Sequence, residues 1–139
     1  MKNAYPTFIA VSAGVHLVYV PDMDIYTEGN SLIDAIEMAR DAIGQKGIAM
    51  EDLGLTIPKA SEMEDAFKKA KTELFDYSKG TCTLVDVDFL EYRRKSDNKM
   101  VRRNVTLPGW MNYEAEKQGL NVSKVLQEAL KERIQHVAL

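Results

Sequence analysis

The sequence predicts an α+β chain with two small domains, because secondary-structure pattern, charge and apolar content all change along its 139 residues. Residues 1–90 combine strand-like and helix-like segments and carry 15 Asp and Glu against 8 Lys and Arg, a net charge of −7. Residues 91–139 carry 6 Asp and Glu against 10 Lys and Arg, a net charge of +4. The segment "EYRRKSDNK" between them has almost no apolar residues, which is typical of a linker. We therefore predict domains at residues 1–90 and 99–139, joined by a linker at 91–98.

The first domain is expected to contain an antiparallel sheet. Residues 6–13 and 15–20 are rich in β-branched and aromatic residues and are separated only by Gly14, a pattern typical of a β-hairpin. A short third strand at 25–27 follows the turn-forming Pro-Asp pair at 21–22. A further strand is predicted later in the domain, over 81–90. The side chains of this strand alternate between its two faces. One face carries Val85, Val87 and Phe89, and the other carries Leu84, Asp86 and Asp88.

Two helices are expected in the same domain. Ser31 should begin the first helix, with Asp34 completing a capping box at its N-terminus. Apolar residues then recur at helical spacing, and Gly44 or Gly47 should end the helix. A second amphipathic helix is predicted over 63–74, with Leu74 as the last residue of its apolar face.

Residues 99–139 combine one short strand at 100–107 with two helices. Pro108 should stop the strand, Gly119 should end the first helix, and Ser123 should cap the N-terminus of the second. These elements cannot bury their apolar surface alone, because a lone strand has two unpaired edges. A second copy of the chain must supply the other strand, so we predict a ribbon-helix-helix domain that dimerises through a two-stranded antiparallel ribbon. The expected dimer core comprises Val101, Val105, Leu107, Trp110, Val125, Leu126 and Leu130.

The opposite face of that strand is suited to reading base edges in the DNA major groove. Alternation directs Arg102, Asn104 and Thr106 outward; Arg fits guanine, Asn fits adenine, and Thr donates, accepts or touches a thymine methyl. Arg103 falls on the inward face, so we expect its stem to pack and its guanidinium to reach a phosphate. The alternative is that these residues are only the solvated face of an ordinary strand. At the start of the second helix, backbone amides and a positive dipole end predict a phosphate clamp formed by Asn121, Val122, Ser123 and Lys124.

Three stretches carry a resemblance to a known family: "YVPDMDIYTEGNSLIDAIEMARDAIG", "TLVDVDFLEYRRK" and "NKMVRRNVTLPGWMNYEAEKQGLNVSKVLQEALKERI". Together they resemble the HicB antitoxins of type II toxin-antitoxin systems over nearly the whole chain. The resemblance implies a partial RNase H-like fold for the first domain, which would bind and block a HicA-like mRNA-cleaving ribonuclease toxin. It also implies that the chain, as a homodimer or tetramer, binds operator double-stranded DNA and represses its own operon.

A ribonuclease that binds RNA should be basic, so the resemblance supplies a partner for the acidic first domain. The candidate toxin contacts are Asp22, Asp24, Tyr26 and Glu28. Turn formation for Asp22 and solvation of the others explain the same residues without a partner. A ribbon-helix-helix repressor with no toxin partner, or an interaction module whose tail only dimerises, also fits the sequence.

A metal-dependent RNase H-like nuclease is the remaining alternative. It draws on the carboxylates Asp22, Asp24, Asp86 and Asp88, because such active sites cluster acids around two metal ions. No helix-borne acid is identifiable that would complete a metal pair, and no nucleophile or acid can be paired with His16 by spacing. We therefore expect no catalytic residue, metal or cofactor.

The apolar runs of the chain are short and its single cysteine stands alone. The longest runs, at 8–13 and 15–20, fall far short of a membrane span, and the N-terminus lacks a signal-peptide pattern. A cytoplasmic protein with no membrane partner is the prediction. Cys82 has no second cysteine with which to form a disulfide within the chain, and we expect it to be a small buried apolar residue.

Overall fold

The computed structural model describes the fold of residues 1–138 and the side chains of residues 1–135. Residue 139, the last of the predicted C-terminal domain, lies outside the described residues. The chain divides into two compact units, Met1–Asn98 and Lys99–Leu139. Each unit is described by itself below.

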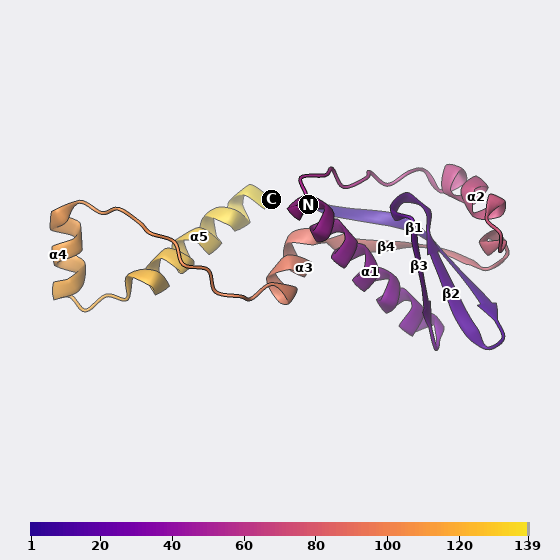
Figure 1. Ribbon diagram of the computed structural model, residues 1–139, viewed down its shortest axis with the longest axis horizontal. Helices are drawn as coiled ribbons and strands as arrows, with labels where there is room; N and C mark the ends of the chain where they lie inside the picture. Colours follow the sequence, from indigo (N-terminus) through magenta and orange to yellow (C-terminus); the bar gives the residue numbers. More distant parts are fainter. Residues whose placement is uncertain (139) are drawn as a thin grey trace. The chain divides into compact units, whose positions relative to one another are not determined.

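The first unit is built on one four-stranded antiparallel sheet (Figure 1). Its strands, in the spatial order β3-β2-β1-β4, are β1 (Lys2–Ser12), β2 (Val15–Val20), β3 (Ile25–Gly29) and β4 (Thr81–Asp88). The predicted hairpin is confirmed: Ser12 pairs with Val15 across a two-residue turn. Ala13 and Gly14 occupy that turn with φ of 52° and 78°, the left-handed conformation that tight hairpin turns require. The predicted α+β class with an antiparallel sheet is therefore confirmed.

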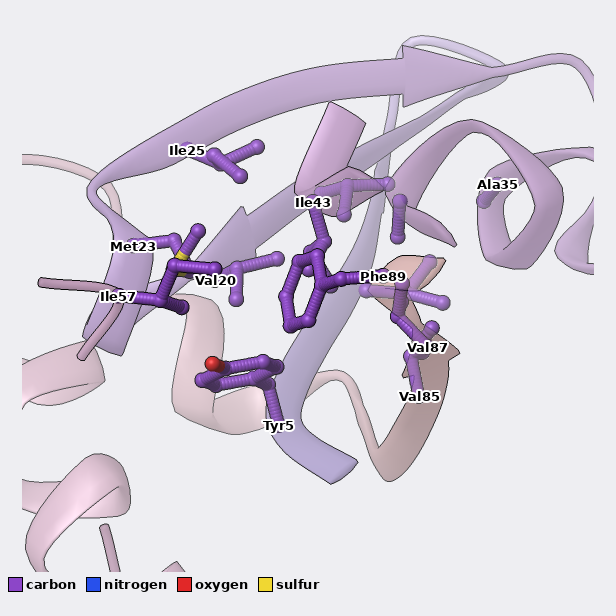
Figure 2. Packing of buried hydrophobic residues seen from close by; sticks show 13 residues of the cluster. Tyr5, Val20, Met23, Ile25, Ala35, Ile43, Ile57, Val85, Val87 and Phe89 are labelled. Carbon is purple, nitrogen blue, oxygen red and sulfur yellow. The ribbon is translucent and has the colours of Figure 1, made fainter. Parts of the chain in front are cut away.

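Helices cover both faces of this sheet. On one face lie α1 (Leu32–Asp52) and α3 (Phe89–Ser96), over the larger core cluster shown in Figure 2. In that cluster the rings of Tyr5 and Phe89 meet edge to face, with centroids 6.4 Å apart. On the other face α2 (Met63–Thr72) and the short 3-10 helix η2 (Tyr77–Lys79) bury a second cluster. The members of that cluster are Phe8, Ala10, Tyr19, Ala66, Ala70 and Tyr77.

The first helix begins as predicted but ends later. Ser31 accepts a hydrogen bond from the backbone N–H of Asp34 at 3.0 Å, which confirms the predicted cap. The prediction that Gly44 or Gly47 ends the helix is wrong, because both glycines are buried within α1. A Cβ at Gly44 would overlap the Tyr92 ring, and a Cβ at Gly47 would overlap the Phe89 ring. Glycine at these two positions therefore serves close packing of α3, which local sequence patterns do not report.

The predicted linker at 91–98 and the domain boundary at residue 90 also need correction. Residues up to Ser96 form α3, and the first unit extends to Asn98. Asp88 caps α3 by accepting the backbone N–H groups of Leu90 and Glu91. One charged side chain of the segment binds it to α1: Arg93 Nη2 lies 3.0 Å from an Asp52 carboxylate oxygen, whereas Arg94 pairs with Glu91 within α3.

The second unit contains two helices, α4 (Gly109–Lys117) and α5 (Val122–Ala138). The predicted helix end at Gly119 is confirmed, because Gly119 follows α4 with a left-handed φ of 67°. The Gly119 N–H donates to the Glu116 carbonyl, and the Leu120 N–H donates to the Ala115 carbonyl. The predicted Ser123 cap is wrong, because Asn121 caps α5 by accepting the N–H of Lys124 at 3.2 Å. Residues 97–108 form no strand within this single chain. A strand is defined by pairing, so the predicted ribbon at 100–107 stays a prediction.

Candidate functional site

The second unit exposes the apolar residues that the sequence predicts as a dimer core. The exposed fraction is 84% for Val101, 69% for Trp110 and 36% for Leu126. Val105, Val125 and Leu130 are about half exposed, and Leu107 is half-buried. Single exposed apolar residues are common, but a whole unit whose helix stripe and adjoining segment are all uncovered marks an interaction surface.

The polar residues of the same segment are equally accessible. Arg102, Arg103, Asn104 and Thr106 are all exposed and lie in the extended stretch before α4. Which way each would face in a ribbon depends on a partner strand that a single chain does not supply.

The N-terminus of α5 was the predicted phosphate clamp, formed by Asn121, Val122, Ser123 and Lys124. All four residues are exposed. The side-chain amide oxygen of Asn121 is used for capping, and the amide of Lys124 is its donor. The first-turn amides of Val122 and Ser123 have no partner within a helix and point outward from its positive end.

In the first unit, the predicted contact Asp22 lies within the 3-10 helix η1 (Pro21–Met23), and Asp24 caps its C-terminus. Asp22 is half-buried and accepts hydrogen bonds from the Ser61 N–H at 2.9 Å and the Ser61 hydroxyl at 2.7 Å. Lys46 donates to the Met23 carbonyl and Lys69 to the Pro21 carbonyl, so η1 is held from both layers of helices. This segment is thereby a fixed part of the surface.

The other predicted contacts are accessible. Asp24 is exposed and has a φ of 52°, a left-handed conformation at the entry to the edge strand β3. Tyr26 and Glu28 follow on β3, and both are exposed. Their side chains share one face of the sheet, because they are two residues apart on one strand.

Tyr26 belongs to a continuous aromatic cluster that the sequence did not reveal. Its ring stacks on that of Tyr19, with centroids 4.9 Å apart and an interplanar angle of 22°. The Tyr19 ring lies 5.1 Å from that of Tyr77, and Phe75 meets Tyr77 edge-on at 5.1 Å. Tyr19 and Tyr77 are buried, whereas Tyr26 and Phe75 form the exposed ends of the cluster.

Leu74 adjoins this cluster, and its position corrects a prediction. It was expected on the apolar face of a helix over 63–74, but α2 ends at Thr72 and Leu74 is fully exposed. The chain turns away there because Tyr77 must return to the sheet to pack on Tyr19. No local sequence signal separates Leu74 and Phe75 from the apolar face of α2, because the adjacent residues Ala66 and Phe67 pack together on that face.

A carboxylate lies beside the aromatic cluster. Burial first, and the neighbouring Glu73 carboxylate second, raise the pKa of Tyr19, Tyr26 and Tyr77 above the usual tyrosine value. The hydroxyl of Tyr19 is buried and makes no hydrogen bond within residues 1–135. The cluster therefore combines aromatic surface, one acid and one unsatisfied polar atom.

The carboxylates of the nuclease alternative do not converge. Asp22 bonds Ser61, Asp86 lies 3.0 Å from Arg40, and Asp88 caps α3. Among the residues that the structure describes, no group of three or more potential metal ligands is found. The Arg40 guanidinium lowers the pKa of Asp86, as an ion pair should.

His16 and Cys82 lie outside the groups described above. His16 pairs with Gly29 in the sheet, and its Nδ1 is buried without a hydrogen-bond partner in the described chain. Cys82 is exposed on β4, so the expectation of a buried cysteine is wrong; β4 is an edge strand whose outer face is uncovered at that point. Within the described residues, none of the helices has the length and apolar character needed to cross a membrane.

Comparison with known proteins identifies relatives. A family described as the HicB-like antitoxins of bacterial toxin-antitoxin systems matches residues 5–130, a range that enters both units. Among solved structures, a chain of a toxin-antitoxin complex from Streptococcus pneumoniae is 22% identical with a TM-score of 0.56, covering 96% of this chain and 99% of that one. The antitoxin HicB of Burkholderia pseudomallei is 25% identical with a TM-score of 0.53, covering 96% of this chain and 98% of that one. No curated protein matches at a significant level.

Proposed function

The chain belongs to the HicB-like antitoxins of bacterial toxin-antitoxin systems, and from this premise we propose a division of labour between its two units. The first unit binds and neutralises a HicA-like, mRNA-cleaving ribonuclease toxin. The second unit dimerises and binds operator DNA, so that the chain represses its own operon. The family role is regulatory rather than enzymatic.

The observation that carries the DNA-binding part is the uncovered apolar surface of the second unit. Its apolar helix stripe and the segment before α4 are exposed together, and burial of such residues is worth roughly 1.5–3 kcal/mol each. A second copy would cover this surface and pair the two segments as a ribbon. The polar residues Arg102, Asn104 and Thr106 would then face the major groove, with Arg103 and Lys124 at phosphates.

Charge supports both assignments. Residues 99–139 hold 7 Lys and Arg against 4 Asp and Glu, which suits a polyanion. Residues 1–98 hold 11 Lys and Arg against 17 Asp and Glu, which suits a basic protein and repels nucleic acid. The two units therefore favour different partners.

Operator binding is tested by changing Arg102, Asn104 and Thr106 together to alanine in the full chain. Specific binding to the promoter region should be lost at fixed salt, whereas the dimer and toxin binding should remain. The matched control replaces Gln127 and Lys131 with alanine, because both lie more than one turn beyond the start of α5. Undiminished operator affinity in the triple variant would contradict the ribbon.

Neutralisation is tested by co-expression with a HicA-like toxin: under the proposed function, a neighbouring reading frame should encode this small basic protein. The full chain should restore growth, and residues 1–98 should do so without the second unit. Failure of both to rescue would remove the toxin from the proposal and leave a ribbon-helix-helix repressor without a toxin partner.

A further inference from the structure

The aromatic cluster of the first unit ends in a contiguous exposed surface. We name the aromatic-acidic surface by its residues, Tyr26, Glu73, Leu74 and Phe75. Leu74 is fully exposed, Tyr26 is 54% exposed and Phe75 is 38% exposed. Three neighbouring large apolar side chains left open on one unit are typical of a protein-docking patch rather than of a monomer's ordinary surface.

The surface is preorganised by buried neighbours. Tyr26 stacks on Tyr19, and Phe75 packs against Tyr77, both of which are buried. Rings that are already immobile lose little conformational entropy when a partner covers them. Interface residues of this kind contribute most of the binding free energy.

The electrostatics select the partner. Besides burial, the carboxylates of Glu73 and Asp24 act on Tyr26, and both raise the pKa of its hydroxyl. The α2 lysine nearest in chain order to Glu73 is Lys71, whose ammonium lies over the Phe67 ring, 4.9 Å from its centroid. A cation placed over an aromatic ring beside a carboxylate is attracted by both the ring and the carboxylate.

We propose that the aromatic-acidic surface is the toxin-docking site, and that it holds an arginine or lysine side chain of the basic toxin over Tyr26 with Glu73 as its counter-charge. This inference rests on the proposed function and replaces one of the sequence-predicted contacts, since Asp22 is occupied by Ser61. Tyr26 is retained, and Glu73, Leu74 and Phe75 are added.

The first test places a bulky cation within the aromatic-acidic surface. Leu74→Arg in the full chain should weaken binding to the purified, catalytically inactive neighbouring toxin by at least about tenfold, measured by calorimetry. Leu53→Arg is the matched control, because Leu53 is an exposed leucine at the end of α1 with an exposed fraction of 76%. It should leave toxin affinity unchanged, and neither variant should alter folding because both leucines are open to solvent.

The second test isolates the charge. Glu73→Gln should weaken toxin binding mainly at low salt, so that the difference from the unmodified chain shrinks as salt is raised. Glu64→Gln, an exposed acid on α2, is the control for net charge.

The possible results distinguish a failure of the proposed docking site from a failure of the proposed antitoxin function. Loss of affinity in Leu74→Arg and Glu73→Gln, with both controls unchanged, supports the docking site. Full affinity in Leu74→Arg overturns this inference and leaves the antitoxin function intact. Absence of toxin binding by the unmodified chain overturns the proposed function itself.

Discussion

The carboxylate of Asp22 holds Ser61 by two hydrogen bonds, at 2.9 Å from the backbone N–H and at 2.7 Å from the hydroxyl. The two residues are 39 positions apart in the chain and join η1 to the loop that leads into α2. An acid predicted as a partner contact is therefore a structural bridge between two loops.

Replacing Asp22 should consequently affect stability rather than toxin binding. Asp22→Ala leaves the half-buried Ser61 N–H unsatisfied and should lower the free energy of unfolding by about 1–3 kcal/mol, as measured by urea denaturation. Asp24→Asn is the control, because Asp24 is exposed and asparagine tolerates the same left-handed backbone. Equal stability of Asp22→Ala and the unmodified chain would contradict the bridge.

Gly47 lies against the ring of Phe89, and a side chain there should separate α3 from α1. Gly47→Ala should destabilise the first unit by about 1–3 kcal/mol through overpacking and should speed hydrogen exchange of the α3 amides. Gly109→Ala has open space around its Cβ and lies at the start of α4, where alanine is the better helix former. A loss of similar size in both variants would show that the packing of Phe89 is not the cause.

The hydroxyl of Tyr92 donates a hydrogen bond to Asp41 at 2.6 Å. Burial and then the Asp41 carboxylate raise the pKa of Tyr92 to about 12, from a usual value of 10. The unfolded chain therefore loses this proton first, and the stability contributed by the raised pKa is present below pH 10 and lost as the pH rises toward 12. Between about pH 9 and about pH 11, the urea midpoint should fall less for Tyr92→Phe than for the unmodified chain.

Other tyrosines with raised pKa values titrate in both proteins, so some alkaline loss should remain in Tyr92→Phe. An identical fall in the two proteins would mean that Tyr92 ionises equally easily in the folded and unfolded chain.

Trp110 is the single tryptophan of the chain and is 69% exposed when the chain is alone. If the second unit dimerises as proposed, its emission should shift to shorter wavelength as protein concentration rises, because the partner covers the ring. Leu130→Asp should abolish that shift and give a monomer by sedimentation, since a charge would be buried in the dimer core. Leu53→Asp provides the same substitution in the first unit, and a shift that survives Leu130→Asp would argue against this dimer interface.

Local features of the fold follow directly from the sequence. The Ser31 cap, the Gly119 helix end, the hairpin turn and the alternation of β4 each depend on residues within about one turn or one strand pair of each other. In β4, Val85 and Val87 are buried and Leu84 and Asp86 are exposed, as the alternation predicts. The antitoxin family is likewise apparent from the sequence and is shown by the family comparison.

Features that depend on distant contacts were decided by the tertiary structure. Gly44 and Gly47 resemble helix ends until α3 is found to pack on them, and the polar segment before residue 97 resembles a linker until Arg93 is found beside Asp52. The aromatic-acidic surface also depends on distant contacts. Tyr26 and Phe75 are 49 positions apart in the chain, and the buried rings of Tyr19 and Tyr77 connect them.

The sequence by itself therefore determined the α+β class, the family and the local caps and turns, because each is encoded by neighbouring residues. Only the tertiary structure decided which acids are structural and which are available, because a carboxylate's role depends on what the fold brings to it. The sequence alone does not distinguish the roles of the acidic residues Asp22 and Glu73. Asp22 is occupied by Ser61, whereas Glu73 lies beside an open aromatic surface.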